Sequence, residues 1–286
     1  GGRTIFESGA IIDYLIRRHA GGRLQPDPAS PAYDDYQMWM HYAEGSAMLP
    51  LMLNLYVSRL GDDGEPLSDE ELRDQLLLLV VAGHETTAKA MTWTLYLLAR
   101  APDVQDAVRA EVARVVGAGA FEARHMGDLA LTTRVLKESM RLYPPAPFMT
   151  RVAAADTEIA GKPIPAGTLV NMPIYAIHRL PAFWDDPEGF DPDRWVDGRA
   201  DVAKKAGAYL PFGMGQRRCV GEPLGMLEAR LVLATLLRKV RLQLMPGQSL
   251  EHEVSVTLRP RGGLWMTASP FVTRMPSETR RTLPSR

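Results

Sequence analysis

The sequence predicts a mainly α-helical fold with small β-sheets, an α+β class, and three observations favour it. A length of 286 residues with 46% apolar content suffices for one large core or two small ones. Long stretches carry apolar residues at helical spacing, and these are residues 68–99, 102–116, 129–142 and 224–240. Short β-like stretches bounded by glycine and proline turns lie at residues 157–170 and 254–267.

Composition and charge narrow the classes of function. The net charge of −1 gives no general attraction to nucleic acid. The longest apolar run, residues 76–82, is too short to cross a bilayer, and no secretory leader is evident. A single cysteine is compatible with a reducing compartment. We therefore predict a cytoplasmic protein with no membrane span and no nucleic-acid partner.

The first 60 residues predict two helices joined by a proline-rich linker. Ser8 is a candidate N-cap of a short amphipathic helix that ends at a pair of glycines. Residues 25–31 contain three prolines, and a longer helix follows to about residue 59 with a stripe of aromatic residues and methionines. Packing in a core is the simplest interpretation of that stripe.

Two motifs in this segment resemble bacterial glutathione S-transferases: residues 7–15 (ESGAIIDYL) and 36–46 (YQMWMHYAEGS). The resemblance implies that Glu7 and Ser8 contact the γ-glutamyl end of glutathione, as a carboxylate and a hydroxyl can do. Helix capping by Ser8 is the alternative interpretation. Because the strands and the thiol-activating helix of that family are absent, we predict only a fragment, residues 1–60.

A turn-rich acidic junction at residues 61–66 precedes the next long helix, for which Ser68 and Glu71 form a capping box. This helix contains the sequence AGHETT at residues 82–87. A glycine inside a helix costs roughly 1 kcal/mol relative to alanine, which favours a close approach by another group. The acid and the hydroxyls need partners in so apolar a stretch. The alternative is a helix with one solvated polar turn.

Two further helices are predicted by a proline at the start of residues 102–116 and by the Pro144–Pro145 pair after residues 129–142. In the second helix Glu138 and Arg141 are three residues apart and share a face. The β-like residues 157–170 come next, and residues 254–258 and 264–267 flank two glycines in a manner that predicts a hairpin.

The most specific stretch is residues 212–221 (FGMGQRRCVG), which contains the one cysteine of the chain. Cys219 lies just before a predicted helix, where unpaired N–H groups and the helix dipole favour a thiolate. Glycines let the backbone approach a large, flat group, and the arginines add positive charge. A small buried hydrophobe is the alternative interpretation of a lone cysteine.

Four motifs resemble the cytochrome P450 family: AGHETT at residues 82–87, ExxR at 138–141, FxPxRW at 190–195 and FGxGxRxCxG at 212–221. The resemblance implies heme as cofactor, with Cys219 as the iron ligand. It also implies that five further residues contact the heme, which are Arg151, Phe212, Gly213, Arg217 and Gly221. It further implies that Thr86 holds oxygen by hydrogen bonding, that Glu85 relays protons, and that Glu138, Arg141 and Arg194 form a structural salt-bridge triad.

We therefore predict a partial cytochrome P450 fold over residues 61–272 and a disordered tail over 273–286. The function that follows is a heme-thiolate monooxygenase inserting one oxygen atom from dioxygen into a small apolar substrate. Its electrons would come from a separate ferredoxin or flavin reductase. The alternatives are a glutathione S-transferase-like binding module and an inactive fusion of two incomplete domains.

Overall fold

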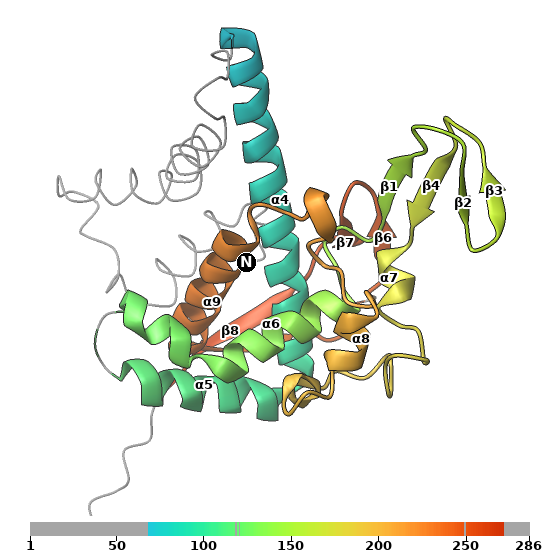
Figure 1. Ribbon diagram of the computed structural model, residues 1–286. Coiled ribbons are helices and arrows are strands. Elements are labelled where there is room, and N and C mark those ends of the chain that lie inside the picture. Colours follow the sequence, from blue (N-terminus) through green and yellow to red (C-terminus); the bar gives the residue numbers. More distant parts are fainter. Residues whose placement is uncertain (1–67, 118, 120, 249, 272–286) are drawn as a thin grey trace, which may run out of the picture.

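The computed structural model describes residues 68–117, 119, 121–248 and 250–271. In these residues four long helices cross one another and small antiparallel sheets lie around them (Figure 1). The α-helices are α4 (Asp69–Arg100), α5 (Pro102–Val116), α6 (Ala130–Leu142), α7 (Ile174–Ile177), α8 (Asp201–Lys205) and α9 (Glu222–Leu237). The strands are β1 (Met149–Val152), β2 (Thr157–Ile159), β3 (Lys162–Ile164), β4 (Leu169–Met172), β5 (Val240–Leu244), β6 (His252–Val254), β7 (Leu258–Pro260) and β8 (Met266–Pro270).

The long helix α4 begins at the predicted capping box. The Glu71 N–H donates to Ser68 Oγ over 3.3 Å, and the Ser68 N–H donates to Glu71 Oε2 over 2.9 Å. Both orphan donors at this helix start are thereby satisfied. The helix ends at Arg100, and Pro102 starts α5 at the position where a missing N–H costs nothing. The predicted boundaries of these two helices are confirmed to within one residue.

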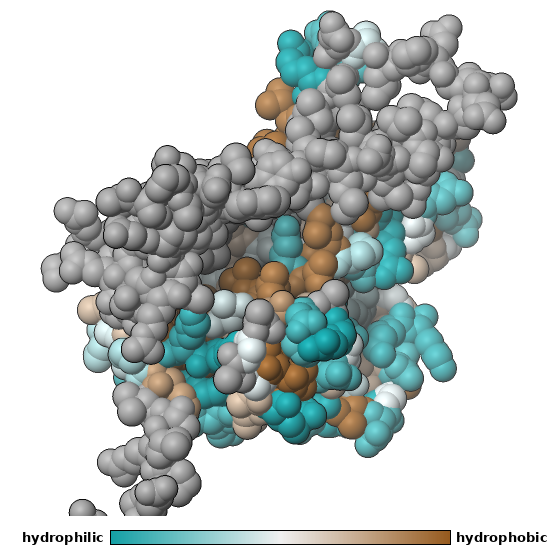
Figure 2. All heavy atoms as spheres, turned by 90° about the vertical axis from the view of Figure 1, so that its left-hand side faces the viewer, coloured by the Kyte–Doolittle hydropathy of each residue, from teal (hydrophilic) through white to brown (hydrophobic). Residues whose placement is uncertain are grey.

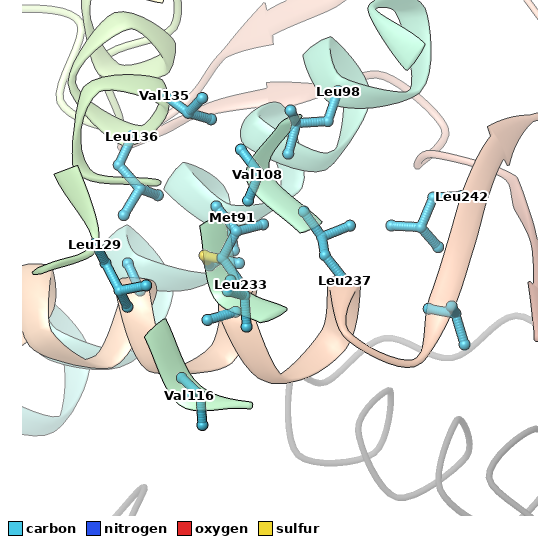
Figure 3. Packing of buried hydrophobic residues seen from close by; sticks show 14 residues of the cluster. Met91, Leu98, Val108, Val116, Leu129, Val135, Leu136, Leu233, Leu237 and Leu242 are labelled. Carbon is cyan, nitrogen blue, oxygen red and sulfur yellow. The ribbon is translucent and has the colours of Figure 1, made fainter. Parts of the chain in front are cut away.

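The core lies where α5, α6 and α9 pack around the C-terminal half of α4 (Figure 3). Leu98, Val108, Leu136 and Leu233 each expose 1% or less of their surface. Each such side chain contributes about 1.5–3 kcal/mol by leaving water. The N-terminal half of α4 extends beyond the other described elements (Figure 1). It exposes large apolar side chains, which are Leu77, Leu78, Val80 and Val81. Hydrophobic residues are also visible on the face shown in Figure 2.

Four two-stranded antiparallel sheets complete the described fold, and one of them corrects a prediction. β6 pairs with β7, whereas β8 pairs with β5, so residues 254–258 and 264–267 do not form a hairpin together. The predicted turn at Gly262 and Gly263, both at positive φ, instead carries the chain from one sheet to another. β8 pairs with β5 because Val240 and Leu242 of β5 are buried in the core. This pairing depends on tertiary packing, which a local turn signal does not reveal.

The predicted β-like stretch 157–170 consists of the β2–β3 hairpin and the start of β4. Gly161 at φ +78° makes the hairpin turn, and Gly167 at φ +79° turns the chain into β4. β4 pairs with β1, placing Arg151 opposite Val170.

Several predictions fall on residues outside those described. These are the glutathione S-transferase fragment with Glu7 and Ser8, and the tail at residues 273–286. In the part of the chain that the structure describes, no helix has the length and apolar character needed to cross a membrane.

Candidate functional site

The loop before α9 presents its cysteine to solvent. Gly213 and Gly215 adopt φ of +71° and +68°, a region that side chains with a Cβ rarely occupy. The Cys219 N–H donates to the Phe212 carbonyl over 2.8 Å and closes the loop. Gly221 is the N-cap of α9, and Cys219 itself is exposed. The interpretation of Cys219 as a small buried hydrophobe is therefore wrong.

This loop packs against β1, the strand that carries Arg151. A Cβ added at Gly213 would lie 3.2 Å from Met149 Sδ, closer than nine in ten real contacts. Arg151 and Arg217 consequently line one pocket of about 560 Å³, together with three residues of β1, Met149, Thr150 and Val152. The pocket thus brings together two predicted cofactor contacts that are 66 positions apart in the sequence.

The two arginines of this pocket differ from their neighbour Arg218 in their ion pairs. Neither Arg151 nor Arg217 forms an ion pair within the described residues, and Arg151 donates only to the Thr150 carbonyl, at 2.9 Å. Arg218, the neighbour of Arg217, differs because its Nε donates to Glu222 Oε2 over 2.7 Å. Two uncompensated guanidinium groups that share a pocket are suited to a ligand with carboxylates.

The polar turn of α4, residues 82–87, lies at a contact between α4 and α9. A Cβ on Gly225 of α9 would be 3.5 Å from Thr87 Oγ1, so the helix that follows the cysteine loop touches this turn. Thr86 Oγ1 donates to the Ala82 carbonyl over 2.6 Å, which leaves its oxygen free to accept a hydrogen bond. Glu85 Oε1 accepts from Thr257 Oγ1 over 2.7 Å. The alternative interpretation, a solvated polar turn, is wrong for Glu85, because this residue is half-buried and its carboxylate accepts a hydrogen bond from Thr257.

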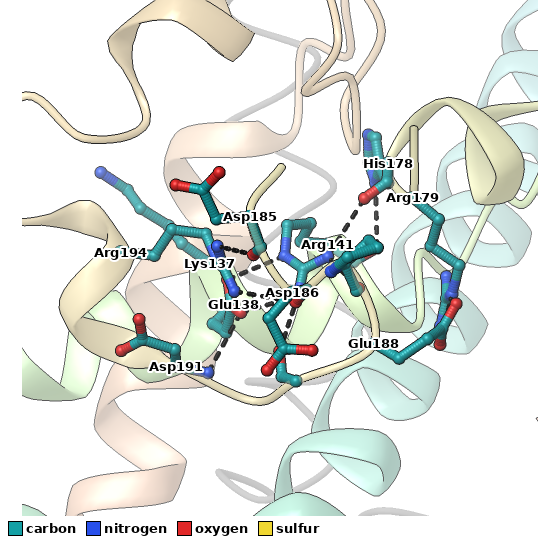
Figure 4. A network of polar contacts seen from close by, with 12 residues as sticks. Lys137, Glu138, Arg141, His178, Arg179, Asp185, Asp186, Glu188, Asp191 and Arg194 are labelled. Carbon is teal, nitrogen blue, oxygen red and sulfur yellow. Dashed lines mark hydrogen bonds and ion pairs between the residues drawn. The ribbon is translucent and has the colours of Figure 1, made fainter. Parts of the chain in front are cut away.

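The predicted triad forms a buried polar network (Figure 4). Glu138 accepts from Arg141 Nη2 at 2.8 Å and Nε at 3.0 Å, and from Arg194 Nε at 3.3 Å. It also accepts from Trp195 Nε1 at 3.0 Å and from the Asp191 N–H at 3.2 Å. The side chains of Glu138 and Arg141 are fully buried. Five donors to one carboxylate offset the cost of burying its charge.

The remaining N–H groups of Arg141 and Arg194 bind backbone carbonyls of the segment that precedes the cysteine loop, residues 212–221. Arg141 donates to carbonyls at three positions, which are His178, Pro187 and Gly189. Arg194 donates to the carbonyls of Asp185 and Asp186. The network therefore fixes the course of residues 185–189 through backbone groups.

His178 connects this network to the cysteine loop. Its Nε2 accepts from the Leu210 N–H at 2.7 Å, and its Nδ1 faces the Arg141 carbonyl at 3.2 Å. The ring is therefore neutral, with its proton on Nδ1. Burial lowers the pKa of His178 to about 4. Leu210 in turn accepts from the Gly213 N–H, so the histidine orients the first residues of the loop.

Two partners of predicted site residues were missed by sequence reasoning. Trp195 is inside a recognised motif, but nothing in that motif indicates that its indole donates to Glu138. Thr257 lies 172 positions from its partner Glu85, in a stretch without a motif, and no sequence signal connects the two.

The site fits a heme cofactor on two observations. Cys219 is exposed, and the pocket that contains Arg217, two residues before it, holds two arginines without acidic partners among the described residues. In the described residues, no group of three His, Cys, Asp or Glu could hold a metal ion. The fold and site together define a mainly helical protein with an exposed cysteine in the loop before a long helix and a pocket lined by two arginines beside that loop.

The model of the cytochrome P450 family matches residues 44–268, and the chain belongs to this family. Members of the family are heme-thiolate enzymes, so heme is the cofactor of this family. The match begins inside the segment that we assigned to a glutathione S-transferase fragment, so it does not support a boundary at residue 60.

Relatives and solved structures agree with this assignment. The chain is 40% identical to cyclooctatin synthase of Streptomyces melanosporofaciens over 226 residues, 79% of this chain and 47% of the relative. It is 31% identical to pentalenene oxygenase of Streptomyces avermitilis over 261 residues, 87% of this chain and 58% of the relative. The crystal structure of the cytochrome P450DA heme domain superposes with a TM-score of 0.68 at 34% identity, covering 76% of this chain and 49% of that chain. The chain thus spans about half the length of the proteins it matches.

Proposed function

We propose that this chain carries the heme-binding half of a monooxygenase that inserts one oxygen atom from dioxygen into a small apolar substrate. The observation that supports this most is the loop with Cys219 beside a pocket whose two arginines have no acidic partner among the described residues. When bound, heme supplies the activation of dioxygen and the transfer of oxygen.

The residues have distinct roles in this proposal. Cys219 ligates the iron through its thiolate, and Arg151 and Arg217 bind the carboxylates of the cofactor. Phe212, Gly213 and Gly221 shape the loop: the first accepts from the Cys219 N–H, the second permits the turn, and the third caps α9.

The polar turn of α4 handles protons. Thr86 accepts a hydrogen bond at its oxygen, because its own proton is held by the Ala82 carbonyl. Glu85 has one carboxylate oxygen bound by Thr257 and a second, Oε2, with no hydrogen-bond partner among the described residues. A carboxylate with one free oxygen can accept a proton from water and pass it on.

The substrate and electron donor are proposed at the level of class. The name of pentalenene oxygenase states that this relative oxygenates pentalenene, which favours an apolar organic substrate here as well. We propose a separate ferredoxin or flavin reductase as electron donor and a cytoplasmic location.

A spectrum tests the proposal. The full chain is expressed with heme supplied, reduced, and exposed to carbon monoxide. We expect the red-shifted Soret band of a thiolate ligand, its loss in Cys219→Ser, and its retention in Gln216→Ala, a change in the same exposed loop. Failure to take up heme, or an unchanged spectrum in Cys219→Ser, contradicts the proposal.

A second candidate function rests on the sequence around Glu7 and Ser8, which favours a glutathione-binding segment. If it is present, the chain is retained on immobilised glutathione and released by Glu7→Ala together with Ser8→Ala. Absence of retention removes this candidate. Absence of both retention and heme uptake favours the inactive fusion.

A further inference from the structure

The turn between β6 and β7 contacts the polar turn of α4. Thr257 lies in this three-residue turn, exposes 3% of its surface, and donates from Oγ1 to Glu85 Oε1 over 2.7 Å. This hydroxyl is the one hydrogen-bond partner of the Glu85 carboxylate among the described residues. A hydrogen bond to a carboxylate that is sheltered from water is stronger and more directional than one between neutral groups.

The backbone holds Thr257 in place independently of its hydroxyl. Trp93, two helical turns after Glu85 on α4, donates from Nε1 to the Leu258 carbonyl over 3.0 Å. The Leu258 N–H donates to the Pro145 carbonyl over 3.0 Å, and Leu258 is fully buried. The Trp93 ring is itself stacked on Tyr143 at 4.0 Å. The turn is therefore attached to α4 and to the end of α6, which makes Thr257 a rigid donor.

We propose that Thr257 is a positioning residue that fixes one oxygen of the Glu85 carboxylate and directs the other, Oε2, to proton transfer. The β6–β7 turn is then a third element of the site, besides α4 and the cysteine loop. This inference deepens the proposed function and rests on it for its catalytic consequence. The hydrogen bond itself is testable without cofactor.

The first experiment uses the full chain without heme. Glutamate labelled with ¹³C at its side-chain carboxyl carbon, Cδ, is incorporated into the chain. The Glu85 resonance is assigned by its disappearance in Glu85→Gln. Thr257→Val keeps the shape of the side chain but removes the donor, so we expect this resonance to move. In Thr257→Ser, which retains a hydroxyl, it should stay near its original position. An unmoved resonance in Thr257→Val overturns the inference.

The second experiment uses the heme-loaded chain with an electron donor and measures hydrogen peroxide released per product formed. We expect about a tenfold rise in this ratio for Thr257→Val, the scale of one hydrogen bond to a charged group. Thr257→Ser should restore the original ratio. In a Glu85→Gln background, Thr257→Val should add nothing, because its effect passes through Glu85.

These outcomes distinguish a failure of the proposed function from a failure of the positioning role of Thr257. Loss of the thiolate spectrum in the parent chain defeats the proposed function and leaves the cofactor-free resonance test standing. An unchanged peroxide ratio in Thr257→Val, or an additive effect in the Glu85→Gln background, defeats the positioning role while the proposed function stands. If Thr257→Val does not fold, Thr257→Ala is measured in its place with the same expectations.

Discussion

Two of the arginine-containing regions of this molecule are built in opposite ways. Around Glu138, two arginines are buried, and each is bound to the same carboxylate and to several backbone carbonyls. At the pocket beside Cys219, Arg151 and Arg217 are exposed and have no acidic partner among the described residues. In the first region a carboxylate of the protein partly balances the charge of the two arginines, and in the second no such carboxylate is paired with them among the described residues.

From this difference we infer that the arginines around Glu138 stabilise the fold, and we propose that those of the pocket bind a ligand. A buried guanidinium must be paired, because an isolated buried charge costs several kcal/mol. An exposed one carries no such penalty and can remain unpaired until an anion arrives. The contrast predicts that changes in the first region reduce stability, whereas changes in the second reduce affinity for the cofactor.

The largest effect should come from Glu138→Gln. This change keeps the shape of the side chain but leaves two buried guanidinium groups without a counter-charge. We expect the free energy of unfolding to fall by about 3–5 kcal/mol, as for other broken buried pairs. Because a whole domain is stable by only about 5–15 kcal/mol, urea should unfold the variant at a much lower concentration.

A matched control is Glu251→Gln, which removes the acid of an exposed pair with Arg261 at 3.1 Å. Surface pairs of this kind contribute about 0–1 kcal/mol. If Glu138→Gln and Glu251→Gln shift the urea midpoint equally, the buried network contributes no more to stability than an exposed pair, and the expected distinction between the two regions is contradicted.

The next largest effect should be on pH dependence through His178. Burial lowers the pKa of this ring from 6.5 to about 4 in the folded state. Between these values the unfolded chain binds a proton that the folded chain does not, so acid favours unfolding. Stability is therefore fully present above pH 6.5 and is lost as the pH falls towards 4, by roughly 3 kcal/mol in total.

Urea unfolding at several pH values between 4 and 7 measures this slope. His178→Gln, which does not titrate, should flatten it. A slope that survives in His178→Gln would assign the acid sensitivity to other groups.

Local chemistry explains why much of the helical scaffold could be predicted. The start of α4 is determined by Ser68 and Glu71, and the start of α5 by Pro102, all of which act within one turn of helix. Three of the four family motifs also named residues that the structure brings together, which are Glu138, Arg141 and Arg194 in the network and Arg217 in the pocket. Glu138 and Arg141 are three residues apart, so their contact was evident from helix geometry alone.

Contacts between distant segments could not be predicted in this way. β8 joins β5 because buried Val240 and Leu242 select its register, whereas the glycine pair before β8 indicated a nearer partner. Thr257 reaches Glu85 only after α4 and the β6–β7 hairpin have packed together. Such pairings depend on tertiary structure, and one sequence without an alignment contains no record of them.

The smallest effect that still separates the two regions should come from Arg217→Leu. Its side chain has no acidic partner to lose among the described residues, so the urea midpoint of the cofactor-free chain should not change. Heme affinity should fall about tenfold, the scale of one charge-assisted hydrogen bond, measured by titrating heme and following the Soret band. Because the site is exposed, the loss should be smaller at high salt.

Arg218→Leu is the control, since it removes the same charge one position away. Arg218 already binds Glu222 at 2.7 Å on the surface of α9, so its guanidinium is not available to the pocket. We expect little change in heme affinity from this variant. An equal loss from Arg217→Leu and Arg218→Leu would mean that net positive charge near Cys219 attracts the cofactor. The distinction between paired and unpaired arginines would then carry no functional meaning.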